Sequence, residues 1–290
     1  MGTRTTWKSR RVVRSYLGNP RVVFGSGILL AVLLLAALPG LFVVQDAANS
    51  DLSRRLRPPA WGTGDWSYPL GADALGRDLW SRIVLGARIS VTIGVLAVAV
   101  SGSLGVLLGL LSGYYGGKLD SLIAAVTEVQ LAFPFILLAI TIIAARGPDT
   151  ITLVFTLALS GWVVFARVIR GRVFSIRELE YVEAARAVGC RTPRILLNHV
   201  LPQLTGPIVV IGTLEVARMI LLESSLSFLG LGVQDPDISW GQIISDGRQY
   251  IGTAWWLTAM PGLAIALTIL AINVVGEWLT DVLDPALHVS

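Results

Sequence analysis

The chain has 290 residues, of which 54% are hydrophobic and only 14% are charged. Soluble domains carry about 25% charged residues, so this composition excludes an ordinary soluble domain and indicates that lipid surrounds most of the chain. The net charge of +4 is interpreted as membrane topology and not as nucleic-acid binding, because the arginines cluster in loops beside apolar segments.

Six segments are predicted as transmembrane helices, since a spanning helix needs roughly 20 mostly apolar residues. The first is interpreted as a retained anchor and not as a secretory signal. Its apolar run is longer than that of a signal, and no small-residue cleavage site follows it. The predicted spans cover residues 22–44, 89–111, 122–145, 151–169, 207–229 and 255–275.

The distribution of positive charge predicts the orientation. Cytoplasmic loops carry an excess of Lys and Arg, so the N-terminal arm is expected in the cytoplasm, and six spans return the C-terminus to the same side. The arm and first helix occupy 1–45, an extracytoplasmic segment 46–85, a five-helix core 86–280, and a cytoplasmic C-terminus 281–290. The cations of the arm are Arg4, Lys8, Arg10, Arg11, Arg14 and Arg21.

Signatures of several enzyme classes are absent from the sequence. The two histidines, His199 and His288, exclude an HExxH zinc site, and no G-x-S-x-G is present. Leu119 follows Lys118, so this lysine does not belong to a phosphate-binding P-loop. The single cysteine, Cys190, excludes a disulfide framework and a cysteine-based metal site. No catalytic residue and no metal site is predicted, although an intramembrane enzyme, a lone channel and a secondary transporter remain alternatives at this point.

The loop after the fourth span is predicted to contain a helix. Ser175 and Glu178, three residues apart, form a capping-box pattern that places the helix start at Ser175. Gly189 lies where a left-handed residue ends a helix. The apolar face of this helix is expected to consist of Tyr181, Ala184, Ala185 and Val188.

A second short helix is predicted to follow the turn. Thr192 and Pro193 give a helix start, and Pro202 is expected to end the helix. The two helices would form a cytoplasmic hairpin between two spans. From the residues alone, an amphipathic hairpin lying on the membrane surface is an equally good interpretation.

The spacing of Glu183-Ala184-Ala185, Gly189 and Leu201-Pro202 resembles the EAA loop of bacterial binding-protein-dependent ABC importer permeases. This resemblance implies that the loop inserts into a groove on an ATPase and transmits its closure to the membrane. His199 stands where the general pattern has an apolar residue, and the peptide branch often carries histidine there. The implied ATPase-coupling residues are Glu183, Ala184, Ala185, Arg186, Gly189, Cys190, His199 and Pro202.

Other stretches resemble the smaller, C-type permease of the dipeptide, oligopeptide and nickel importers. Residues 69–78 read PLGADALGRD, and they are followed by Gly86-Ala87-Arg88. Glu277 and Thr280 depart from the Asp and Arg that the family carries. Three later stretches fit the same branch: residues 227–232, Ser239-Trp240-Gly241 and Leu283-Asp284-Pro285.

The resemblance implies an all-α membrane protein with six transmembrane helices in the type I ABC importer permease fold. Such a chain is not an enzyme and binds no cofactor of its own, because Mg-ATP belongs to the partner ATPases. The implied partners are a second homologous permease, two ABC ATPase subunits, an extracytoplasmic substrate-binding protein and the lipid bilayer. The implied function is import of di- or oligopeptides across the bacterial cytoplasmic membrane, with nickel or another small solute as the alternative.

Two groups inside the spans are candidates for further roles. Charges within a membrane usually face protein or water, so the charged group of the fifth span is expected either to form a structural ion pair or to line the solute path: Glu215, Arg218 and Glu223. Tandem GxxxG spacing in the second span lets another helix approach closely, either within this chain or from the partner permease: Gly105, Gly109 and Gly113.

Overall fold

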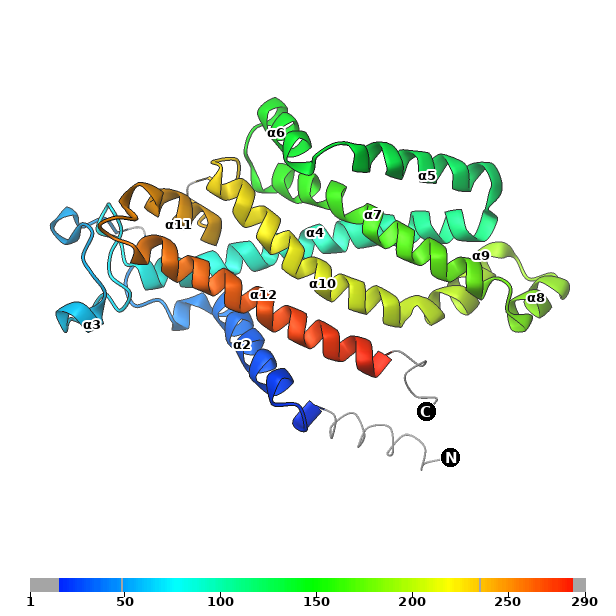
Figure 1. Cartoon of the computed structure of the whole chain (residues 1–290), viewed down its shortest axis with the longest axis horizontal. Helices are drawn as coiled ribbons and strands as arrows, with labels where there is room; N and C mark the ends of the chain where they lie inside the picture. Colours follow the sequence, from blue (N-terminus) through cyan, green and yellow to red (C-terminus); the bar gives the residue numbers. More distant parts are fainter. Residues whose placement is uncertain (1–15, 48, 235, 284–290) are drawn as a thin grey trace.

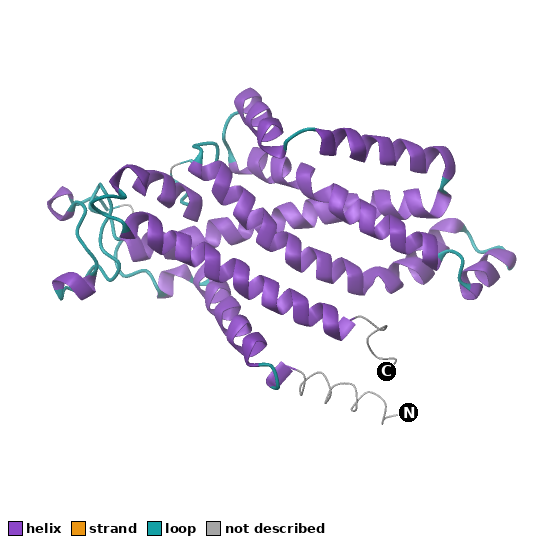
Figure 2. Cartoon of the chain, in the orientation of Figure 1, coloured by secondary structure: helices purple, strands orange, loops and turns teal. Residues whose placement is uncertain are grey.

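The computed structural model describes residues 16–47, 49–234 and 236–283. Its regular structure is helical, and the described residues contain an isolated bridge between Ala72 and Asp78 but no strand (Figure 2). The predicted all-α fold class is confirmed. The basic arm through residue 15 and the C-terminal stretch from Asp284, with His288, lie outside the described residues.

Five helices are long and apolar enough to cross a membrane. Asn19, Asp78 and Asp149 cap three of them, because their side chains accept N–H groups of the first turn. The first ends earlier than predicted, since a proline follows two residues after its last residue and cannot continue a helix. Their bounds are α2 (Pro20–Ala37), α4 (Leu79–Tyr115), α7 (Thr150–Ile176), α10 (Leu201–Phe228) and α12 (Trp256–Leu283).

The third predicted span is bent and not straight. Two helices, α5 (Gly117–Ala132) and α6 (Phe135–Arg146), meet at an angle of 88°. Pro134 lacks the N–H that would continue the helix, and it restricts the preceding Phe133, which has an extended conformation with ψ 128°. The single helix expected over 122–145 is therefore two helices, and the number of spans is six when the bent pair is taken as one.

The long helices lie side by side and separate two ends of the molecule (Figure 1). α4 packs along α7 and α10, α10 packs on α12, and α2 leans against α12 and α4. One end carries α3 (Ala60–Thr63) and α11 (Trp240–Gly247), and the opposite end carries α8 (Glu180–Ala187) and α9 (Thr192–Ile195) (Figure 1). Four shorter pieces complete the regular structure of the described residues: 3-10 turns at Pro39–Leu41, Leu52–Arg54 and Arg248–Tyr250, and a π-helical segment at Leu196–Val200.

Three glycines allow α4 to lie directly on α7 of the same chain. A Cβ on Gly109 would stand 2.7 Å from the carbonyl oxygen of Ala166, and one on Gly113 would stand 2.7 Å from Cβ of Val173. A Cβ on Gly105 would overlap the carbonyl oxygen of Trp162. We call this contact the α4–α7 seam. These glycines were expected to pack either within this chain or against the partner permease. Their contacts with α7 are packing within the chain.

Candidate functional site

The helix–turn–helix at one end of the bundle is built on Gly189. This residue has a φ of 79° and follows α8 and Val188. The N–H of Gly189 donates to the carbonyl of Arg186, and the N–H of Cys190 donates to the carbonyl of Ala185, both at 3.0 Å. This pair of bonds is a Schellman motif, in which the residue with positive φ turns the chain out of the helix. The left-handed turn expected at Gly189 is confirmed.

The first helix of the hairpin begins later than the capping pattern predicts. Ser175 lies in the last turn of α7, and α8 starts at Glu180. Because α7 continues past Ser175, no helix start is available there, and Glu178 pairs with Arg177 at 2.9 Å. The predicted capping box at Ser175 and Glu178 is wrong.

α8 also buries a different face from the one expected. Val182 and Ala185 are buried and join the apolar cluster formed by the ends of α7 and α10. Tyr181 and Ala184 are exposed, and Val188 is 80% exposed. Neighbouring residues of a helix differ by about 100° in direction, so moving the buried stripe by one residue brings Val182 inward in place of Tyr181. Of the predicted stripe, Ala185 alone is buried.

Pro202 does not end the second helix of the hairpin. α9 passes through the π-helical segment into α10, and the N–H of Leu201 donates to the carbonyl of Leu196, five residues earlier. Pro202 comes just after the π-helical segment, so its missing N–H falls where the regular ladder of hydrogen bonds is already interrupted. His199 is half-buried within the π-helical segment. The predicted hairpin is therefore joined to α10 without an intervening loop.

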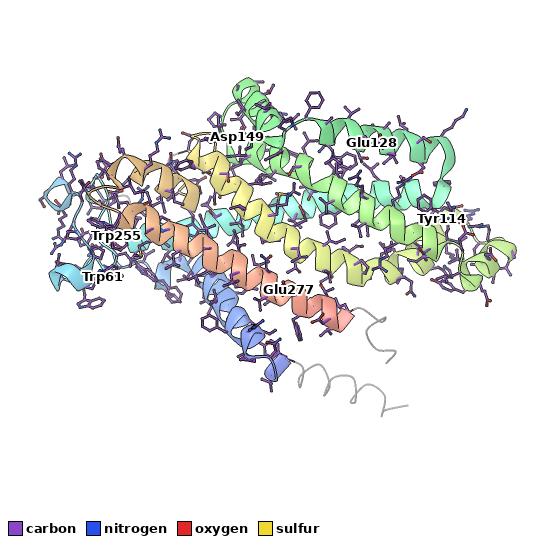
Figure 3. The ribbon with its side chains drawn as sticks, in the orientation of Figure 1. Trp61, Tyr114, Glu128, Asp149, Trp255 and Glu277 are labelled. Carbon is purple, nitrogen blue, oxygen red and sulfur yellow. The ribbon has the colours of Figure 1, made fainter. Side chains whose placement is uncertain are left out.

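The outward side of the hairpin is accessible and carries both charged and apolar side chains. Glu183, Ala184 and Arg186 are exposed, and the guanidinium of Arg186 lies 5.6 Å from the ring centre of Tyr114 at the end of α4 (Figure 3). A hollow of about 400 Å³ lies beside this contact, and half-buried Cys190 contributes to its wall. Six of the eight predicted coupling residues thus belong to α8 and its turn, whereas His199 and Pro202 lie at the base of α10.

The three charged residues of α10 have different surroundings. Glu215 is 6% exposed and forms an ion pair at 3.0 Å with Arg218, whose side chain is 41% exposed. Glu223 is fully buried, and its carboxylate accepts hydrogen bonds from Ser227 at 2.7 Å and from Ser90 of α4 at 3.1 Å. The expected pairing of Glu215 with Arg218 is present. Glu223 faces α4 inside the chain. Because both glutamates are buried, Arg218 is the most exposed of the three charged residues.

The sequence of the chain is similar to those of known membrane transport proteins. Residues 105–289 match the family described as binding-protein-dependent transport system inner membrane component. The chain belongs to this family. The permease is 38% identical to a dipeptide transport system permease of Alkalihalophilus pseudofirmus, over 95% of this chain and 89% of that protein. It is 38% identical to a glutathione transport system permease of Pectobacterium atrosepticum, over 98% of this chain and 92% of that protein.

The fold of the permease is also similar to that of a solved transporter. An inward-facing structure of the MetNI methionine ABC transporter contains a chain that matches with a TM-score of 0.57 and 17% identity. The match covers 70% of this chain and 96% of that chain. The permease is accordingly a non-catalytic, multi-pass inner-membrane component that works with an ATPase and a binding protein, and ATP is handled by the ATPase.

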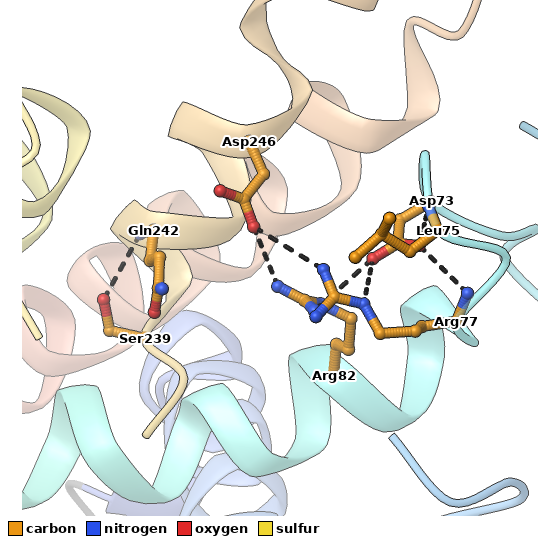
Figure 4. Close-up of polar contacts among 7 residues, drawn as sticks. All are labelled: Asp73, Leu75, Arg77, Arg82, Ser239, Gln242 and Asp246. Atoms are coloured by element: carbon orange, nitrogen blue, oxygen red, sulfur yellow. Dashed lines mark hydrogen bonds and ion pairs between the residues drawn. The ribbon is translucent and has the colours of Figure 1, made fainter. Parts of the chain in front are cut away.

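Sequence reasoning missed an ionic cluster at the α3–α11 end of the permease (Figure 4). Arg82 of α4 is 1% exposed, and its guanidinium lies 3.4 Å from the carboxylate of Asp73 and 2.9 Å from that of Asp246 in α11. Arg77 also pairs with Asp73, at 2.7 Å. Burial raises the pKa of the nearby Asp78 carboxyl, despite its hydrogen bonds from Ser81. The missed signal was the number of charges in the short stretch 73–82.

Asp73 is expected to be the most costly member of this cluster to replace. Its carboxylate accepts hydrogen bonds from the N–H groups of Leu75 and Arg77 as well as binding both guanidinium groups. Breaking a buried ion pair costs about 3–5 kcal/mol, so Asp73→Ala should lower the melting temperature of the purified permease clearly. Asp246→Ala should lower it less, because the Asp246 side chain is 47% exposed. Equal losses for the two variants would contradict this ranking.

Proposed function

We propose that this permease carries di- or oligopeptides into the cell. The observation that carries the proposal is similarity along nearly the whole chain to permeases named for dipeptide and glutathione transport. The permease would form the solute path with a second, homologous permease. Two ATPase subunits would supply the driving force, and an extracytoplasmic binding protein would deliver the peptide.

The α8–α9 hairpin is proposed as the contact with the ATPase. Three features support this role: its outward residues are accessible, its turn is fixed by Gly189, and α9 runs directly into α10. ATP-driven closure of the ATPase pair would displace the hairpin, and α10 would pass the displacement to the membrane part. In this arrangement the hairpin and both termini face the cytoplasm, and the α3–α11 end faces outward.

Substrate uptake tests the peptide proposal. Uptake of a radiolabelled dipeptide and of nickel is measured in a strain that lacks this permease and in the same strain with the gene restored. Restoration should return dipeptide uptake and leave nickel uptake unchanged. Recovery of nickel uptake alone would assign the permease to the nickel alternative.

Labelling of Cys190 tests the orientation. It is the only cysteine of the chain and lies half-buried at the hairpin turn. A membrane-impermeant maleimide should leave it unlabelled in intact cells and label it in inside-out vesicles. Bound ATPase should slow the labelling, because the hairpin would then be covered. Rapid labelling in sealed cells would place the hairpin outside and reverse the proposed orientation.

A further inference from the structure

We propose that Glu128 of α5 lines the solute path between this permease and the second one, and that its carboxylate receives the cationic amino terminus of a peptide. The inference rests on the proposed function and names a substrate contact within it. Glu128 lies in the third predicted span, but it was not among the charged residues singled out from the sequence. Figure 3 labels its position on α5.

Glu128 lies near the middle of the membrane. It is 11 residues beyond Gly117, the first residue of α5, or about 16 Å along the axis at a rise of about 1.5 Å per residue. The hydrocarbon core of a bilayer is about 30 Å thick. A neighbouring contact gives the same depth, because Gln130 accepts a hydrogen bond at 2.7 Å from Nε1 of Trp162, close to the midpoint of α7.

The face of α5 that carries Glu128 is not covered by this chain. Glu128 is exposed, whereas Ile123 and Thr127 form the buried side of the helix. Around it lie exposed apolar side chains: Leu122, Val126, Val129 and Leu131, each between 49% and 62% exposed. A carboxylate at mid-membrane depth is costly against lipid and is found facing protein or water. This face of α5 is therefore the side on which the second permease and the path lie.

Within the described residues, Glu128 has no ion-pair partner closer than 4 Å. Arg170 interacts with it at longer range, but its guanidinium is bound through two hydrogen bonds, of 2.5 and 2.6 Å, to Asp120. Arg218 is likewise bound to Glu215. The negative charge of Glu128 therefore remains available to a cation supplied from outside the chain.

An ammonium group is the cation that a peptide supplies. It carries a full positive charge and three N–H donors, and a carboxylate accepts such bonds more strongly than a neutral group does. A single carboxylate surrounded by apolar side chains would hold the amino terminus while tolerating varied side chains. An arginine or lysine of the second permease could use the same carboxylate, and the experiment must separate the two occupants.

The first test uses the complete importer, with both permeases, the ATPases and the binding protein, in proteoliposomes. Glu128→Gln removes the charge and keeps the shape, and it should lower the maximal rate of uptake of a free-amine dipeptide about tenfold or more, as loss of a charged hydrogen bond predicts. Glu128→Asp should restore most of the uptake. Glu277→Gln is the matched control, since Glu277 is an exposed acid of α12 lying close to that helix's end (Figure 3).

The second test measures access from water. In a Cys190→Ser background, Glu128→Cys should react with a cationic methanethiosulfonate reagent, and the dipeptide should slow the reaction. Leu33→Cys on the anchor helix α2, where Leu33 is 44% exposed, should remain unreactive. The inference is overturned if the cysteine is unreactive, if Glu128→Gln loses the second permease on purification, or if Glu128→Gln transports normally. Failure of the unmodified importer to transport dipeptides would instead contradict the proposed function, and the labelling result would still report whether position 128 faces water.

Discussion

Gly105→Leu should abolish the native fold of the permease, the largest effect expected for any single substitution in the membrane part. Even a methyl group at this position would overlap the carbonyl oxygen of Trp162 and lie 2.6 Å from Cβ of Phe165. These atoms belong to the backbone of α7 or to its first side-chain carbon, so no rotamer change can relieve the contact. α4 and α7 would have to separate along the α4–α7 seam.

The expected magnitude exceeds that of ordinary overpacking. Extra methylene groups in a packed core cost about 1–3 kcal/mol when side chains can adjust, and here the obstructing atoms cannot. Most of the protein should be lost from the monodisperse peak in detergent size-exclusion chromatography. Gly262→Leu provides the control, because nothing lies within 4 Å of a Cβ at Gly262 in α12. A normal peak for Gly105→Leu would show that the seam does not hold the helices together as described.

Gly189→Val should leave the permease folded and inserted but disconnect it from ATP hydrolysis. Nothing lies within 4 Å of a Cβ at Gly189, so the cost arises from its φ of 79° and not from a clash. The left-handed conformation costs an L-residue about 1–2 kcal/mol, and a β-branched side chain makes that conformation a marked outlier. The turn would open, and the hairpin would lose its position on the ATPase.

The measurement is substrate-stimulated ATP hydrolysis in the assembled importer, which should fall at least tenfold. Gly189→Asn is the matched control, because asparagine adopts positive φ more readily than other residues. It should retain most of the stimulation. Full stimulation in Gly189→Val would contradict the coupling role proposed for the hairpin. A reduced amount of this variant in the membrane would show that the substitution impairs folding and not coupling alone.

Features set by local chemistry could be predicted from the sequence. Apolar length located the spans, and Gly189 marked the turn because few residues other than glycine accept its backbone conformation. The bend at Pro134 was also available in the sequence, but the length of the apolar run concealed it. The late start of α8 was not predictable, since it depends on α7 continuing through Ser175 to pack against α4.

Contacts between distant segments were the least predictable. Arg82 meets Asp246, 164 residues away, only after α11 folds back onto the start of α4. Glu223 illustrates the same difficulty. Its helix position was clear from the sequence, but the direction in which it points depends on Ser90 in another helix. Exposure of Glu128 is likewise a property of how α5 packs, and periodicity alone gave no reason to select it.

The passage from α9 through the π-helical segment into α10 contains no loop, and it makes this part of the permease a rod whose interruptions lie in its first half, from the π-helical segment to Pro207. From Thr192 to Phe228 it spans 37 residues, or about 55 Å at a rise of about 1.5 Å per residue. Bending should concentrate at Leu196–Val200 and Pro202, where the regular hydrogen-bond ladder is already interrupted. A push on the hairpin would therefore act through this joint, and the part of α10 beyond it would tilt as one lever that carries Glu223 and the contact with α11.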